Sequence, residues 1–142
     1  MAEVYRTAAS LRFHGDSLDP DEISGILGAQ PTKGVRKGGI WITPRGAEIV
    51  AWTGSWRLST PDESPGDLDK QVAELFAPLN VDLDAWRALS SRFRGNIFVG
   101  VFLSGFNEGL GLSPTTTSAI GLRGLVLEVD IYGADSLDQE AV

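Results

Sequence analysis

The feature that most constrains this sequence is the run NIFVGVFL at residues 96–103, which is apolar on both sides of a β-strand. Successive side chains of a strand point to opposite faces of its sheet. Ile97, Val99 and Val101 therefore share one face, and Phe98 and Phe102 share the other. Apolar residues on both faces are typical of a strand that is covered on both sides. We predict that 96–103 is an internal strand of a sheet.

Two longer segments alternate between apolar and polar residues, as half-buried strands do. The inward rows are Tyr5, Ala9, Leu11 and Phe13 in residues 3–14, and Leu125, Leu127, Val129 and Ile131 in residues 125–132. A further strand is expected at about 47–59, with short strands near GIWIT (39–43) and LGLS (110–113). Alternating strands need only one covered face, which favours a mostly antiparallel sheet.

Helices are indicated by their terminal residues and apolar stripes. In LDPDEISGILG (18–28), Asp19 is suited to cap the helix, Pro20 to begin it, and Gly28 to end it, while Glu22 completes a capping box. Stripes at 68–79 and 83–93 predict two more helices, and Pro114 begins a fourth. Residues 112–120 repeat the Leu, Pro, Ser and Ile of 18–26 at the same offsets, which is compatible with a duplicated strand–helix–strand unit.

This order of elements predicts an α+β fold with helices packed on one face of a mostly antiparallel sheet. We expect a single domain over 1–133 and a polar C-terminal tail over 134–142. The start of the sequence, MAEVYRTAAS, has no signal-peptide pattern, and no apolar stretch is long enough to span a membrane. A cytoplasmic location is therefore expected, in keeping with the absence of cysteine.

The amino-acid composition excludes several kinds of functional site. The 142 residues contain no cysteine and one histidine, which excludes disulfides, thiolate chemistry and multi-histidine metal sites within one chain. The acids Asp16, Asp19, Asp21 and Glu22 lack the spacing of a calcium-binding loop. No nucleotide-binding or hydrolase motif is present. We therefore assign no catalytic residue, metal ligand or cofactor, and a binding module is favoured over an enzyme.

One segment is strongly cationic although the formal net charge is −7. Residues 33–45, the cationic loop, contain Lys33, Arg36, Lys37 and Arg45 without an acid, whereas residues 62–84 contain seven acids. Two interpretations stay open. The loop binds a small anionic ligand or an acidic partner protein, or it pairs with the acids of 62–84. Nucleic acid is not expected as a partner, because the chain as a whole is acidic.

The polar face of the expected sheet is the alternative site. It carries Arg12, His14, Arg57 and Tyr132, together with Glu128 and Asp130. His14 lies near Asp16 in the sequence, so an undescribed enzyme with a site near His14 and Arg57 is the competing hypothesis. A homodimer is a further way to cover this face. Trp52 and Trp56 are expected in the core beside Val50 and Leu58, or else form an aromatic platform around Gly54.

The sequence resembles a bacterial family known as domain of unknown function 4279. The resemblance rests on LDPDEISGILGAQPT (18–32), RKGG (36–39), TGSWRLS (53–59) and GLGLSPTTTSAIGLRGLVLEVDIYG (109–133), which occur in the expected order. It implies an architecture, and it implies neither a reaction nor a ligand. No functional residue is carried over from it.

Overall fold

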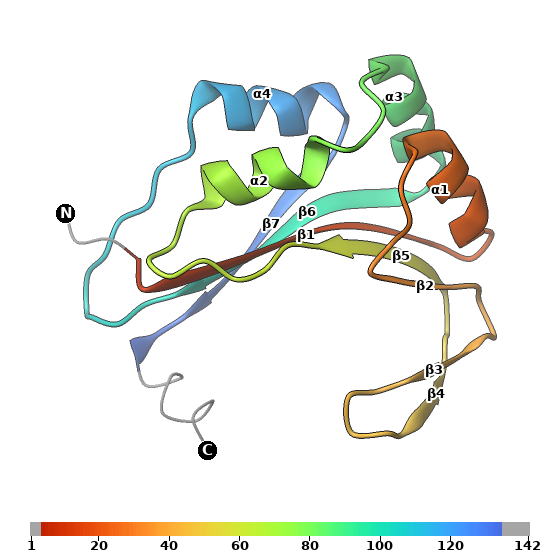
Figure 1. Ribbon diagram of the computed structural model, residues 1–142, viewed down its shortest axis with the longest axis horizontal. Coiled ribbons are helices and arrows are strands. Elements are labelled where there is room, and N and C mark those ends of the chain that lie inside the picture. Colours follow the sequence, from red (N-terminus) through yellow and green to blue (C-terminus); the bar gives the residue numbers. More distant parts are fainter. Residues whose placement is uncertain (1–3, 135–142) are drawn as a thin grey trace.

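The computed structural model describes residues 4–134, which form an α+β fold (Figure 1). The elements in chain order are β1 (Arg6–Gly15), α1 (Pro20–Leu27), β2 (Lys33–Val35), β3 (Ile40–Ile42), β4 (Glu48–Val50), β5 (Gly54–Ser59), α2 (Leu68–Phe76), α3 (Leu83–Arg92), β6 (Arg94–Phe102), α4 (Pro114–Leu122) and β7 (Val126–Tyr132). All four helices lie on the same side of the main sheet (Figure 1). Within 4–134, none of the helices is both long and apolar enough to cross a membrane.

The main sheet has the strand order β2-β5-β1-β6-β7, and β3 and β4 form a separate hairpin. Only the β6–β7 pair is parallel among the pairs of the main sheet, so the prediction of a mostly antiparallel sheet is confirmed. β6 lies between β1 and β7, as expected for the apolar run at 96–103. Its residues Ile97, Val99 and Val101 are buried against the helices.

The core lies between the helices and one face of the sheet. The inward residues Ala9, Leu11 and Phe13 of β1 are buried, whereas Tyr5 precedes the strand and is exposed. Phe13 packs between two tryptophans, with ring centroids 6.3 Å from both Trp56 and Trp86. The opposite face of the sheet carries no helix (Figure 1), and we call it the open face.

The expected ends of α1 are confirmed. Asp19 accepts a hydrogen bond from the backbone N–H of Asp21 (3.0 Å), and Gly28 ends the helix with a φ of 84° in the left-handed region. Glu22 does not complete the capping box, because its carboxylate accepts a hydrogen bond from Arg92 on α3 (2.8 Å). The predicted start of the helix is therefore correct, although Glu22 contacts Arg92 of α3 and does not cap α1.

α4 begins in the same way as α1, with Ser113 as its cap and Pro114 in its first turn. Both helices connect parallel strands: α4 joins β6 to β7, and α1 joins β1 to β2, which both run antiparallel to β5. β5 lies between β1 and β2, however, whereas β6 and β7 are adjacent. Duplication of the strand–helix–strand unit therefore stays a prediction.

The expected strand at 47–59 is wrong as a single element. It divides into β4 and β5. Backbone hydrogen bonds of Ala51 with Gly38 and Gly39 direct β4 away from the main sheet, so that β4 belongs to the hairpin. Trp56 is fully buried, as predicted, but Trp52 lies in the bend and is 82% exposed. Gly54 does not leave room for a flat ligand, since a Cβ there would lie 2.7 Å from the backbone oxygen of Gly15.

Two further expectations need correction. LGLS forms no strand, and the backbone N–H of Ser113 instead donates to Asp69 on α2 (3.0 Å). In β7, the row predicted to point inward is exposed at Leu127 (36%), Val129 (45%) and Ile131 (67%), because β7 lies at the edge of the sheet. The predicted polar tail falls almost wholly outside the described residues.

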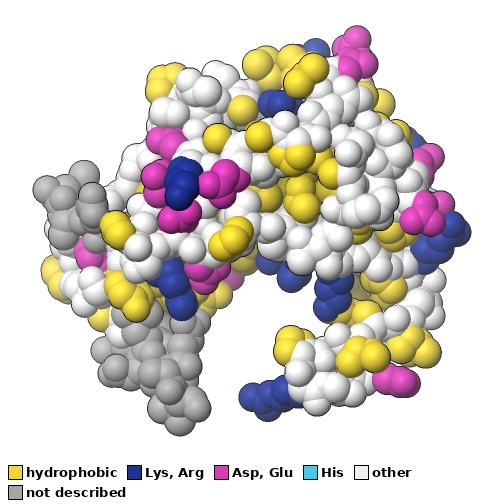
Figure 2. All heavy atoms as spheres, viewed as in Figure 1, with side chains coloured by type: hydrophobic (Ala, Val, Ile, Leu, Met, Phe, Trp, Pro, Cys, Tyr) yellow, Lys and Arg dark blue, Asp and Glu magenta, His cyan; other side chains and the backbone are white. Residues whose placement is uncertain are grey.

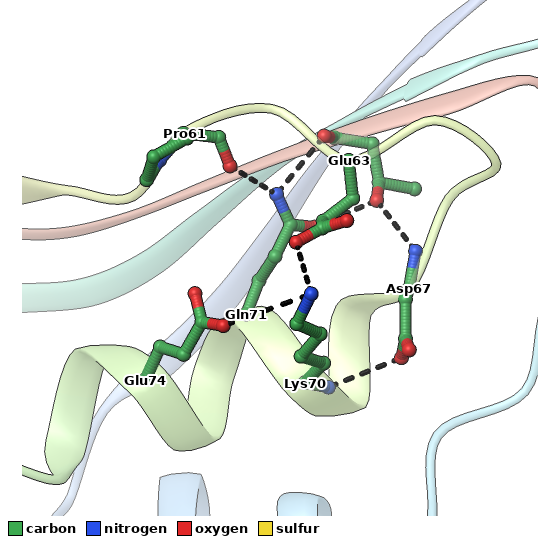
Figure 3. A network of polar contacts seen from close by, with 7 residues as sticks. Pro61, Glu63, Asp67, Lys70, Gln71 and Glu74 are labelled. Carbon is green, nitrogen blue, oxygen red and sulfur yellow. Dashed lines mark hydrogen bonds and ion pairs between the residues drawn. The ribbon is translucent and has the colours of Figure 1, made fainter.

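A buried polar residue fixes α2 to the sheet, and the sequence analysis did not identify it. Gln71 is fully buried, and its amide nitrogen donates to the backbone oxygens of Thr7 (3.0 Å) and Pro61 (3.1 Å). Its amide oxygen accepts from the Thr7 hydroxyl (2.6 Å), which in turn accepts from the backbone N–H of Asp67 (2.9 Å). Figure 3 shows this network beside the exposed Lys70–Glu63 ion pair. The network joins α2, β1 and the loop between β5 and α2.

Replacing Gln71 with leucine should destabilise the fold while conserving most of the side-chain volume. The oxygens of Thr7 and Pro61 would lose a donor, and a buried unpaired group costs about 1–3 kcal/mol. Urea denaturation of Gln71→Leu measures the loss. Lys70→Gln, on the same helix, is the matched control and should change stability by no more than about 1 kcal/mol. Equal stabilities for the two variants would contradict the role given to the network.

Candidate functional site

The clearest concave site lies between the open face of the sheet and the β3–β4 hairpin. The hairpin leaves the sheet after β2 and returns to β5, and it hangs below the open face (Figure 1). Figure 2 shows the resulting hollow, with Lys and Arg side chains along the margin that the sheet provides. A pocket of about 310 Å³ lies here, and its lining comes from β1, β2, β5 and the hairpin. We call it the hairpin pocket.

The hairpin is held in place by hydrogen bonds at both of its ends. At the base, the backbone N–H of Gly38 donates to Ala51 (2.7 Å), and that of Ala51 donates to Gly39 (2.8 Å). At the tip, the backbone N–H of Thr43 donates to the backbone oxygen of Ala47 (2.8 Å), and Gly46 adopts a φ of 85°. These bonds give the pocket a defined wall opposite the sheet.

Three cations form one row across the open face. Lys33 of β2 lies opposite Arg57 of β5, and Arg57 lies opposite Arg12 of β1. Directly opposed side chains have Cβ atoms about 4.5–5.5 Å apart, and like charges at that spacing are destabilising. This cation row therefore opposes folding unless other groups compensate for its charge.

Aromatic rings, rather than acids, face two of these cations. The Lys33 ammonium lies 2.9 Å from the ring centroid of Trp41, and the Arg12 guanidinium lies 4.0 Å from that of Phe98. Arg12 also donates to the Ser10 hydroxyl (2.9 Å). The side chain of Arg57, at the centre of the row, makes no hydrogen bond or ion pair with the residues that the structure describes. Its donors are thus available to a ligand.

The electrostatics of the row agree with this geometry. Desolvation, followed by the charge of Arg57, lowers the pKa of Lys33 below its ordinary value. The pKa of Arg12 is lowered by the same two causes, and Glu128 and Asp130 offset only part of the change. Both shifts arise first from burial and second from repulsion between neighbouring cations. An anion bound between them would relieve this repulsion.

The other wall of the pocket is apolar. Trp41, Ile49 and Val50 of the hairpin line it, and the exposed Trp52 stands at its edge. The indole N–H of Trp41 is buried and has no hydrogen-bond partner among the described residues. No described residue that lines the pocket carries a carboxylate. The pocket therefore combines a cationic floor with an aromatic and aliphatic wall.

His14 occupies the next row of the open face, between Ser55 of β5 and Arg94 of β6. It lines the hairpin pocket and also a neighbouring pocket of about 620 Å³ that contains Arg94 and Glu128. Desolvation, then the charges of Arg12 and Arg57, lower its pKa below the ordinary value of 6.5. This environment therefore favours the neutral form of His14 in the free protein.

The pairing of His14 with Asp16, on which the competing enzyme hypothesis rests, is not formed. Asp16 instead accepts hydrogen bonds from Lys37 (3.2 Å) and from the hydroxyl of Thr53 (3.0 Å). These contacts use the carboxylate at the surface, at the start of the connection to α1. A His–Asp pair for proton transfer is thus absent among the described residues.

The four cations of the cationic loop separate into different environments. Only Lys33 lines the hairpin pocket, while Arg36 pairs with Asp19 (2.7 Å) and Lys37 pairs with Asp16 (3.2 Å) on the surface. Arg45 is exposed in the turn of the hairpin. Tyr132 lies on β7, where its ring stacks on Phe102 with centroids 4.6 Å apart.

The alternative that the loop pairs with the acids of 62–84 is wrong for Arg36 and Lys37. Their partners are the acids of the β1–α1 connection. In the 62–84 segment, Asp62 pairs with Arg6 (3.7 Å), and Glu63 pairs with Lys70 (2.7 Å). The sequence showed where charges of each sign are concentrated, but it did not indicate which acids pair with Arg36 and Lys37.

The acids near α1 do not form a metal site in the described part of the chain, where no group of three or more potential ligands comes together. Asp19 caps α1 and holds Arg36, and Glu22 holds Arg92. These contacts account for the acidic cluster at 16–22 without a metal ion.

Sequence reasoning missed two residues that shape the site. Trp41 was seen only as part of a short strand, and Phe98 only as part of the internal strand. The position of Trp41 over Lys33 depends on how the hairpin folds back, which no local pattern reveals. Alternation placed Phe98 on the correct face, opposite that of Val99, but its contact with Arg12 was not predicted.

Comparison with known proteins identifies a family. Residues 3–134 match the family described as domain of unknown function DUF4279. No curated protein and no solved structure matches the chain. Because the family match extends over nearly the whole sequence, the chain belongs to the DUF4279 family.

Proposed function

We propose that this chain is a non-enzymatic binding module whose hairpin pocket takes a small anionic ligand with a flat apolar part. The cation row carries the proposal: three positive charges lie side by side, two of them (Lys33 and Arg57) line the hairpin pocket, and no described residue of its lining carries a carboxylate. Repulsion within the row is a cost to the fold that a bound anion would offset.

Arg57 is the central contact in this proposal. Its guanidinium has no partner among the described residues, and its planar donors suit the paired oxygens of a carboxylate, sulfonate or phosphate group. Lys33 and Arg12 flank it in the row. Trp41 and Trp52 would contact the apolar part of the ligand, since both line the pocket.

The cationic loop has a divided role in this proposal. Lys33 contacts the ligand, whereas Arg36 and Lys37 anchor the loop to Asp19 and Asp16. Arg45 lies exposed in the hairpin turn and does not line the pocket. His14 lines the pocket beside the cation row, while Tyr132 lies on β7 and contacts no ligand in the hairpin pocket.

The observed lining favours binding over catalysis. An enzyme that uses His14 as a general base needs a group to orient the imidazole, and Asp16 is engaged elsewhere. His14 meets an acid, Glu128, only in the neighbouring pocket. A cytoplasmic setting is kept as part of the proposal because the sequence contains no cysteine.

Benzenesulfonate is a suitable probe, because it joins a flat ring to an anion whose charge stays constant with pH. Titration calorimetry should show that Arg57→Gln lowers its affinity about 10- to 100-fold, since a hydrogen bond to a charged group contributes about 1.5–3 kcal/mol and about 1.4 kcal/mol is tenfold. Sulfate, which lacks the ring, should bind more weakly than benzenesulfonate to the unmodified protein.

Arg36→Gln is the matched control, because Arg36 belongs to the same loop but pairs with Asp19 outside the pocket. It should bind benzenesulfonate as the unmodified protein does, and thermal denaturation should show both variants folded. The proposal fails if neither benzenesulfonate nor sulfate binds, or if the two variants bind equally.

The pH dependence of binding should report the protonation of His14. In the free protein the lowered pKa means that stability falls as pH drops below the ordinary pKa of 6.5, because the unfolded chain then binds the proton more readily. A bound anion favours the imidazolium, so the affinity for benzenesulfonate should increase as the pH is lowered from about 7.5 to about 5.5. His14→Gln should flatten this rise, and an unchanged profile in that variant would exclude His14 as its source.

A further inference from the structure

β7 leaves a long edge of the main sheet unpaired within the described residues. It is the last strand in the order β2-β5-β1-β6-β7, with β6 on its inner side. The opposite edge strand, β2, has three residues, whereas β7 has seven. Short edge strands limit unwanted pairing, and a long exposed edge is a ready site for an added strand.

The backbone groups that face outward can be assigned from one hydrogen bond. The carbonyl oxygen of Tyr132 accepts from the backbone N–H of Leu103 (2.9 Å), so Tyr132 points its backbone groups toward β6. The direction alternates along a strand, and Asp130 and Glu128 therefore also point inward. The N–H and C=O groups of Leu127, Val129 and Ile131 face outward, where they can pair with another strand.

The side chains of β7 form two rows with different chemistry. Leu127, Val129 and Ile131 lie on the helix side, opposite Ile97, Val99 and Val101 of β6, and they remain 36%, 45% and 67% exposed. Glu128 and Asp130 lie on the open face and are also exposed. A strand that docks here would cover the apolar row and meet two carboxylates.

A second copy of this chain meets like charges when two β7 strands pair about their central residues. If two β7 strands paired antiparallel about Val129, Glu128 of one copy would lie opposite Asp130 of the other. Pairing about Glu128 or Asp130 would place that acid opposite itself. Like charges directly opposed across strands are destabilising, so these registers oppose a β7–β7 dimer.

We propose that the outer edge of β7 binds an extended segment of another protein in which Lys or Arg alternates with apolar residues. The basic side chains would face Glu128 and Asp130, and the apolar side chains would cover Leu127, Val129 and Ile131. The net charge of −7 favours encounter with such a basic segment. This surface is separate from the hairpin pocket, which holds no residue of β7.

The test uses a labelled peptide, acetyl-Val-Lys-Val-Lys-Val-Lys-Val-amide, and the fluorescence anisotropy of its complex with the full chain. The peptide should bind, and a version with Glu in place of every Lys should bind at least about tenfold more weakly. Val129→Pro removes an outward N–H without removing a bond to β6, since proline is tolerated at a strand edge in that orientation. It should weaken peptide binding at least about tenfold.

A charge-reversed variant keeps the test independent of any effect of proline on folding. Glu128→Lys combined with Asp130→Lys changes two exposed residues, and this double variant should reverse the preference toward the Glu peptide. Arg57→Gln should bind the Lys peptide normally, which separates this inference from the function proposed for the pocket. The inference is overturned if neither peptide binds, if both bind equally, or if sedimentation shows a dimer that Val129→Pro dissociates.

Discussion

The rest of the structure depends on the alternation of side chains along β1, which pairs with β5 at one edge and with β6 at the other. Ala9, Leu11 and Phe13 turn toward the helices and are buried. The alternation then places Arg12 and His14 on the open face. A shift of one residue in the register of β1 would bring Arg12 into the core and expose Phe13, so hydrophobic packing on one face fixes the chemistry of the other.

The same register explains why the cation row persists although its charges repel. Lys33, Arg57 and Arg12 lie opposite one another because β5 pairs with both β2 and β1. Moving Arg57 to the helix side would turn its neighbour Trp56 away from the core, because adjacent residues of a strand face opposite sides. Trp56 would then lose its apolar contacts and its hydrogen bond to Ser24 of α1 (3.1 Å). The core holds the row in place, and the rings of Trp41 and Phe98 offset part of its cost.

Local patterns predicted local structure well and long-range geometry poorly. The internal strand at 96–103 and the ends of α1 followed from alternation and from capping residues, which act over a few positions. The division of 47–59 did not, because the bend at Ala51 results from bonds to Gly38 and Gly39. All three members of the cation row were named from sequence, but their alignment depends on strand order. Neither the hairpin pocket nor the exposed edge of β7 has a signature in a single segment.

The open face separates its charges, and distance explains why the separation is maintained. The cation row lies on β2, β5 and β1, and the acids Glu128 and Asp130 lie on β7, with β6 between the row and these acids. Neighbouring strands are about 4.8 Å apart, so β5 and β7 are about 14 Å apart. Exposed charges are screened over about 8 Å at physiological salt. Within the row, the pKa of Arg12 is influenced by Glu128, whereas the pKa of Lys33 reflects desolvation and Arg57 alone. The acids of β7 therefore cannot neutralise the centre of the cation row. The cation row and the acids of β7 thus need separate binding partners.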